Sequence, residues 1–214
     1  MPEKRAMMPR MTSPKGVAKY PKLSEPDTRF KEDGEFNTKL LLDADAATTK
    51  EFIAVLKAAA EAAAEDAKAD LKPAKKTTLE VHYPFKAEID PNSGEETGNI
   101  ELSFKTAATY KTKDGEVINR KIPLFDTKGK RIERKINVGS GSIIKVNFTP
   151  GPFYMANGNK AGITLYLEAV QIIQLKEWKG ATAESYGFGQ EEGFEDEGEQ
   201  FEDNAPADPG KGDF

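Results

Sequence analysis

Basic and aromatic side chains gather in the middle of the chain, and together they suit the binding of a single-stranded nucleic acid. Ten bases and only four acids lie between Lys105 and Lys135. Such binding needs a positive groove that follows the phosphates and rings on which the bases stack. The candidate side chains are Lys105, Tyr110, Lys111, Lys113, Arg120, Lys121, Phe125, Lys130, Arg131, Arg134, Phe153 and Tyr154.

Each of these rings has a second interpretation, because an aromatic side chain packs equally well in a core. Phe104 and Phe148 alternate with polar residues and share a face with aliphatic neighbours, so we assign both to the core. In a strand, Lys121 and Phe125 would point away from the face that carries Ile122. Much of the positive charge is therefore expected on sheet faces and in hairpin turns.

The elements that would carry these side chains are mostly β-strands. From Thr78 onward apolar residues recur at every second position, and turn signals such as Lys113-Asp114-Gly115 separate the runs. One of the strands is expected over 132–138, and a loop is expected over 150–159. About six or seven short strands with one early helix predict a mainly β protein, an OB-fold-like antiparallel barrel of five to seven strands.

The early helix follows a first strand over 36–42. Apolar residues from Phe52 to Leu71, mostly alanine, recur at helical spacing, and Pro73 ends the run. Thr48 and Glu51 fit a capping box, in which each side chain would satisfy an amide of the first turn. We expect this helix to lie close against the sheet or the end of the barrel, because alanine lets two backbones approach.

Both ends of the chain differ in composition from the predicted barrel. Residues 1–35 form an expected extended arm, whose lysines and Tyr20 suit contact with a polyanion or packing across the domain. The barrel domain is expected over 36–180, and an acidic tail, expected to be disordered, over 181–214.

The acidic tail changes the meaning of the net charge. From Glu184 to the C-terminus there are eleven acids and one base, so this stretch carries −10 and the preceding residues carry +5. The tail also holds Tyr186, Phe188 and further phenylalanines. Carboxylates and rings can imitate phosphates and bases, so the tail suits a nucleic-acid groove on its own body. A plain solubilising tail is the alternative.

The sequence offers little material for catalysis. There is no cysteine and one histidine, His82, which is expected to face solvent. Gly139-Ser140-Gly141-Ser142 lacks the Gly-Lys-Ser/Thr that completes a phosphate-binding loop. No cofactor or metal site is expected, and no run of apolar residues is long enough to span a membrane. The N-terminal bases precede no apolar stretch of the secretory type.

Several short motifs occur in an order that is informative as a set. They are Leu71-Lys72-Pro73, Tyr83-Pro84-Phe85, Ala108-Thr109-Tyr110-Lys111, Asp126-Thr127-Lys128-Gly129-Lys130, Val138-Gly139-Ser140-Gly141-Ser142, Pro152-Phe153-Tyr154 and Gly212-Asp213-Phe214. With the acidic tail, this order resembles the bacteriophage single-stranded-DNA-binding proteins of the gene-two-point-five type. The resemblance covers nearly the whole chain.

The resemblance implies an OB-fold core that binds single-stranded DNA without sequence preference and acts in the cytoplasm of an infected bacterial host. It adds Tyr83 and Phe85 to the candidate DNA-binding residues. It also implies that the tail competes for the DNA site, mediates a homodimer, and recruits phage DNA polymerase and primase-helicase. Asp213 and Phe214 are the expected partner contacts.

Two further hypotheses stay open at this point. The chain is either a DNA-binding protein or an acidic-tailed interaction or chaperone-like module whose body binds a protein. A magnesium-dependent nuclease, with Glu80 and Glu88 or Asp90 as ligands, is a distant third.

Overall fold

The computed structural model describes residues 8–29, 31–178, 187, 189 and 191–193. The chain divides into residues 1–179 and residues 180–214, and all described helices and strands belong to the first of these units. The predicted acidic tail therefore lies almost wholly outside the described residues.

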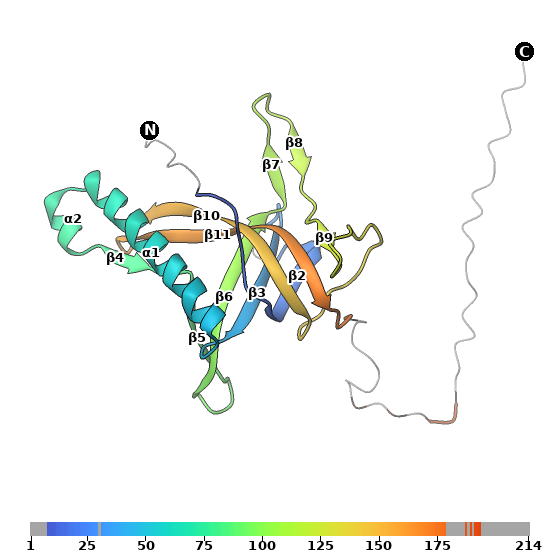
Figure 1. Cartoon of the computed structure of the whole chain (residues 1–214). Coiled ribbons are helices and arrows are strands. Elements are labelled where there is room, and N and C mark those ends of the chain that lie inside the picture. Colours follow the sequence, from blue (N-terminus) through green and yellow to red (C-terminus); the bar gives the residue numbers. More distant parts are fainter. Residues whose placement is uncertain (1–7, 30, 179–186, 188, 190, 194–214) are drawn as a thin grey trace, which may run out of the picture. The chain divides into compact units, whose positions relative to one another are not determined.

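Five long strands close into a barrel (Figure 1). They are β2 (Gly16–Asp27), β3 (Glu35–Asp43), β6 (Glu96–Ala107), β10 (Ile143–Met155) and β11 (Lys160–Gln174). The ring of pairings runs β2-β3-β6-β11-β10 and returns to β2, where Ile143 lies opposite Val17. Only the β6–β11 pair within this ring is parallel. This ring confirms the predicted OB-fold barrel.

Six shorter strands extend the barrel. They are β1 (Met11–Thr12), β4 (Glu80–His82), β5 (Phe85–Ile89), β7 (Thr109–Lys111), β8 (Val117–Asn119) and β9 (Leu124–Phe125). Strands β4 and β9 pair in parallel with β11, β5 pairs with β6, and β1 pairs with β10. Strands β7 and β8 form the predicted hairpin, which projects from the end of β6 (Figure 1).

Helix α1 (Ala47–Ala69) packs on β10, β11 and β4. Its Phe52 ring meets Phe148 edge to face with a centroid separation of 6.0 Å, and Phe148 meets Phe104 at 5.1 Å. Phe104 and Phe148 are fully buried, as predicted. The predicted capping box is wrong, because the helix begins two residues earlier than it requires, and the N-cap is Ala46, whose side chain cannot accept a hydrogen bond.

After α1 the chain turns, and the five-residue helix α2 (Pro73–Thr77) starts with a proline. Pro73 fits this first position because its missing N–H would have no partner within the helix. The proline thus ends one helical run and opens another. None of the described helices is long and apolar enough to cross a membrane.

Three segments differ from their predictions. The segment 132–138 forms no strand; Ile136 and Val138 are buried as part of the core, and the segment makes only one isolated bridge, between Val138 and Glu177. The predicted loop at 150–159 is strand β10 as far as Met155. Pro150 and Pro152 pair with β11, and Pro150 O also accepts a hydrogen bond from the Met8 amide at 3.2 Å. No described strand needs their missing amides on the other side. The predicted extended arm contains β2, a strand of the barrel itself.

Candidate nucleic-acid interface

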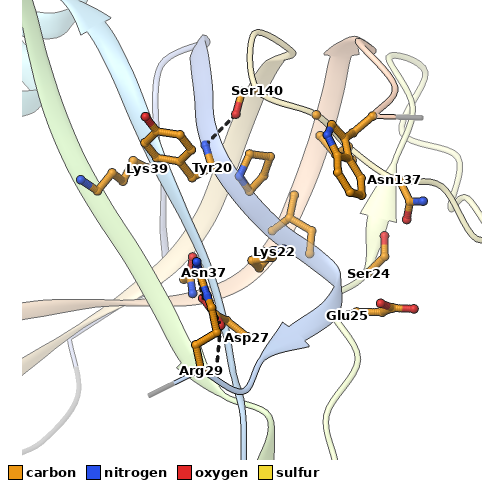
Figure 2. A pocket seen from close by; sticks show the side chains of 15 residues that line it. Tyr20, Lys22, Ser24, Glu25, Asp27, Arg29, Asn37, Lys39, Asn137 and Ser140 are labelled. Carbon is orange, nitrogen blue, oxygen red and sulfur yellow. Dashed lines mark hydrogen bonds and ion pairs between the residues drawn. The ribbon is translucent and has the colours of Figure 1, made fainter. Parts of the chain in front are cut away.

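An open groove lies on the outer surface of β2 and β3, with a volume of about 720 Å³ (Figure 2). One side comes mainly from β2 and β3, and the other from residues 137–140 before β10 together with Trp178, four residues after the end of β11. The lining residues are Tyr20, Pro21, Lys22, Leu23, Ser24, Glu25, Asp27, Arg29, Asn37, Lys39, Asn137, Val138, Gly139, Ser140 and Trp178. Cations and two large rings therefore share one open surface.

The groove continues as a row of polar side chains across four neighbouring strands, β2, β3, β6 and β11. Lys22 pairs in register with Asn37, Asn37 with Lys105, and Lys105 with Tyr166. In β3 these outward positions alternate with the buried residues Phe36, Thr38 and Leu40, so the pleat fixes which side chains face out. The row brings the predicted residue Lys105 together with an exposed ring.

Three exposed rings belong to this surface. Tyr20 is 66% exposed, Trp178 61% and Tyr166 38%. Most of the chain's other aromatic side chains are buried or half-buried in the described structure, so these three are available to a ligand. A surface with rings beside lysines can stack bases and neutralise phosphates at the same time.

A compact ion-pair network lies next to the groove. Lys19 Nζ is 2.7 Å from Glu88 Oε1, and Lys39 Nζ is 2.9 Å from Glu101 Oε1. Lys86 Nζ approaches the same Glu101 oxygen at 3.5 Å. Both carboxylates are buried, and the hydrogen bond from Lys19 lowers the pKa of Glu88 while it raises the pKa of Lys19. Three lysines on two acids leave this cluster with a charge of +1.

A second ion pair, between Arg29 and Asp27, also lines the groove. The Arg29 guanidinium donates hydrogen bonds to both carboxylate oxygens of Asp27, and these bonds lower the pKa of Asp27 to about 2. Figure 2 shows this pair together with Lys22 and Glu25. The carboxylate therefore stays ionised at neutral pH.

Several predicted residues lie beside the end of β6. The Arg120 amide donates to Ala108 O at 2.7 Å, and the Arg120 guanidinium lies 5.3 Å from the centre of the Tyr110 ring. Tyr110 itself is 45% exposed. Lys111 and Lys113 belong to the β7–β8 hairpin, and both are exposed.

The other predicted bases occupy the segment that follows the hairpin. Lys121 is exposed and Phe125 is half-buried, whereas Ile122 and Leu124 are buried, in agreement with the predicted alternation. Lys130 is exposed in the turn that Asp126 Oδ1 stabilises by accepting hydrogen bonds from two backbone amides. The remaining predicted bases, Arg131 and Arg134, are exposed and each lies near an acid. Arg131 is 3.4 Å from Glu133, and Arg134 is 3.9 Å from Glu177.

None of the six predicted rings lines the groove; Tyr110 and Phe125 lie as described above, and the other four lie elsewhere. Tyr83 and Phe85 pack against the core cluster, and the Tyr83 hydroxyl donates to Glu61 of α1 at 3.0 Å. Phe153 meets the exposed His82 ring at 5.5 Å over Gly162, and the Tyr154 hydroxyl bonds Asn159 at 3.0 Å. These rings belong to the region of β4 and the β10–β11 turn.

The sequence analysis did not single out Lys39 and Trp178 of the groove or Tyr166 of the row. It considered Tyr20 and Lys22 only as part of an arm that suits either contact with a polyanion or packing across the domain. Lys39 could have been found, because it alternates with the apolar residues of 36–42. Among the described residues no group of acids or histidine could hold a metal ion.

The closed ring of five strands defines the class of protein: an OB-fold barrel, here with a candidate interface in the groove on its outer face. The sequence model described as "Single-stranded DNA-binding protein, Bacteriophage T7" matches residues 15–175, and the chain belongs to this family. The resemblance found in the sequence is therefore confirmed.

Relatives with curated descriptions support the same assignment. The chain is 29% identical over 99 residues to the single-stranded DNA-binding protein of Enterobacteria phage T3, and 31% identical over 86 residues to that of Escherichia phage T7. These matches cover 45% and 39% of this chain. They span 42% and 36% of the relatives' own lengths, less than half of either protein.

Solved structures share the fold. The crystal structure of gp2.5, a single-stranded DNA binding protein encoded by bacteriophage T7, has a TM-score of 0.68 at 23% identity. That match covers 89% of this chain and all of the other. The single-stranded DNA-binding protein from bacteriophage Enc34 in complex with ssDNA has a TM-score of 0.54 at 14% identity, covering 80% of this chain and 89% of that one.

Proposed function

We propose that this protein binds single-stranded DNA without sequence preference and supports DNA replication, recombination and repair of a bacteriophage. The observation that carries the proposal is the surface formed by the groove and the row Lys22, Asn37, Lys105 and Tyr166. It presents cations and exposed rings on the outer face of an OB-fold barrel. The names of the T3 and T7 relatives agree with this chemistry.

The lack of base-specific hydrogen bonding follows from the same residues. Rings stack on any base because every base has a π-face, and lysine ammonium groups meet phosphates irrespective of sequence. The protein acts by binding and not as an enzyme. Its place of action is the cytoplasm of the infected bacterial host.

The acidic tail regulates this binding in our proposal. Its charge of −10 is tethered to a body of +5, so the tail acts at high effective concentration as a competitor for the DNA site. Released from the body, the tail recruits the phage polymerase and primase-helicase or a second copy of the chain. Asp213 and Phe214 supply the terminal contact.

Titration of a fluorescent oligo-dT at several salt concentrations tests the function. If three to five phosphates are neutralised, the slope of log K against log salt is about −2 to −4, because each contributes about −0.7 on a single strand. Absence of binding by the folded protein would refute the proposal and favour a protein-interaction module. Degradation of the oligonucleotide in magnesium would favour a nuclease.

A further inference from the structure

Tyr20 adopts a backbone conformation that tyrosine rarely takes. Its φ is +51°, in the left-handed region, although it lies inside strand β2. The register explains why: Lys19 lies opposite Lys39, but Lys22 lies opposite Asn37, so one extra residue of β2 is inserted there. Such a bulge re-aims side chains, and bulges are frequent beside functional sites.

The bulge turns the Tyr20 ring away from the core. Ala18 and Leu23 on either side of it are buried, whereas Tyr20 is two-thirds exposed. The fold therefore gains no core packing from this ring. Strained positions of this kind persist where the surrounding structure enforces them, and they cluster at ligand-binding sites.

The surroundings hold the ring in place. The Tyr20 amide donates to Ser140 Oγ at 2.9 Å, which ties the bulge to the opposite side of the groove (Figure 2). The Lys19 ammonium lies 5.8 Å from the centre of the ring and is itself fixed by Glu88. A ring fixed in this way loses little conformational freedom when a ligand stacks on it.

Trp178 is the second large ring that lines this groove. Its amide donates to Asn137 O at 2.9 Å, and the backbone of Gly139 lies so close that a Cβ there would be 3.2 Å from Trp178 Cβ. Trp178 is thus positioned by the same segment, 137–140, that holds Tyr20. Lys22 lines the groove beside them.

We propose that Tyr20 is a base-stacking residue and that the groove it shares with Trp178 receives unstacked nucleobases of the single strand. The strained bulge is kept because it presents the Tyr20 ring to the ligand. This inference rests on the proposed function and names the residues that contact the bases.

The experiment compares two ligands of equal length, oligo-dT and an abasic deoxyribose-phosphate oligomer, on the full chain. Tyr20→Asn removes the ring and places at φ > 0 a residue that tolerates this region. We expect its melting temperature to equal or exceed that of the wild type. Its affinity for oligo-dT should fall about 5- to 150-fold, the loss of one stacked base, with unchanged affinity for the abasic oligomer.

Two controls and an intrinsic probe sharpen the test. Tyr20→Phe keeps the ring and should bind oligo-dT like the wild type, and Val55→Asn, on the exposed side of α1, should change neither ligand's affinity. Trp178 is the chain's single tryptophan, so its fluorescence reports on this groove alone. Oligo-dT should quench it more strongly than the abasic oligomer does.

The outcomes separate the two proposals. A wild type that binds oligo-dT and a Tyr20→Asn variant that binds it equally well would overturn the stacking role alone. An equal loss for both ligands would also overturn it, because the change would then act on the phosphate path. A wild type that binds neither ligand would refute the proposed function itself.

Discussion

Removing two lysines from the groove surface should change the salt dependence of DNA binding by a calculable amount. Lys22 and Lys105 lie on either side of Asn37 in the row, and both are exposed. Neither has a carboxylate within ion-pair distance among the described residues, in contrast to Lys39 on Glu101. They are the cations of this row that can meet phosphates without first breaking an ion pair.

The double substitution Lys22→Ala with Lys105→Ala removes two phosphate contacts. The slope of log K against log salt should become shallower by about 1.4, since each single-strand contact contributes about 0.7. Extrapolated from 1 M salt, where counterion release vanishes, this is a loss of about 60-fold at 0.05 M and about 10-fold at 0.2 M. The affinities of variant and wild type should therefore converge as salt rises.

The assay is fluorescence anisotropy of labelled oligo-dT over this salt range. Lys50→Ala with Lys57→Ala is the matched control, because it removes the same charge from α1, which contributes no residue to the groove. We expect the control to keep the wild-type slope. If the control and the groove variant shift the slope equally, the protein binds through its overall charge and this path for the phosphates is wrong.

Three further predictions concern stability and the tail. Phe148→Ala should lower the free energy of unfolding by about 3–5 kcal/mol in urea titrations, because this fully buried ring joins α1 to the barrel. The Glu88–Lys19 pair should stabilise the fold above the unfolded pKa of Glu, about 4.3, and lose this effect as pH falls through the lowered folded pKa. Glu88→Gln should therefore flatten the acid limb of the stability curve measured by thermal unfolding. Truncation after Trp178 should tighten oligo-dT binding, most at low salt, whereas deletion of Phe214 should leave DNA affinity unchanged and weaken self-association or polymerase binding in sedimentation.

The barrel was largely predictable because most of its strands keep one face buried. The runs around Leu40, Leu102, Val146 and Leu165 alternate with period two, and all four are core strands. Strand β2 was not recognised, since the bulge at Tyr20 shifts the alternation by one residue. The pattern of apolar residues within one segment cannot reveal a strand that contains a bulge, because the bulge is defined by the pairing with the neighbouring strand.

The same limit explains the false strand at 132–138. Its apolar residues alternate because Ile136 and Val138 reach into the core while their neighbours face solvent. A side chain can be buried without its backbone pairing in a sheet. The alternation of buried and exposed residues is therefore real, although the segment is not a strand. The alternation reports which side chains are buried, and not what the backbone pairs with.

The groove could not be read from composition, since a count of cations does not give the charge that a ligand meets. The Lys39 ammonium group, for example, already forms an ion pair with Glu101, so its charge is largely neutralised before a ligand arrives. Lys105 differs only in its neighbours, because Asn37 and Tyr166 lie opposite it where an acid would cancel its charge. Strand register therefore decides whether a lysine is available to a phosphate. It places residues that are far apart in the sequence in one row, whose two ends, Lys22 and Tyr166, are 144 positions apart.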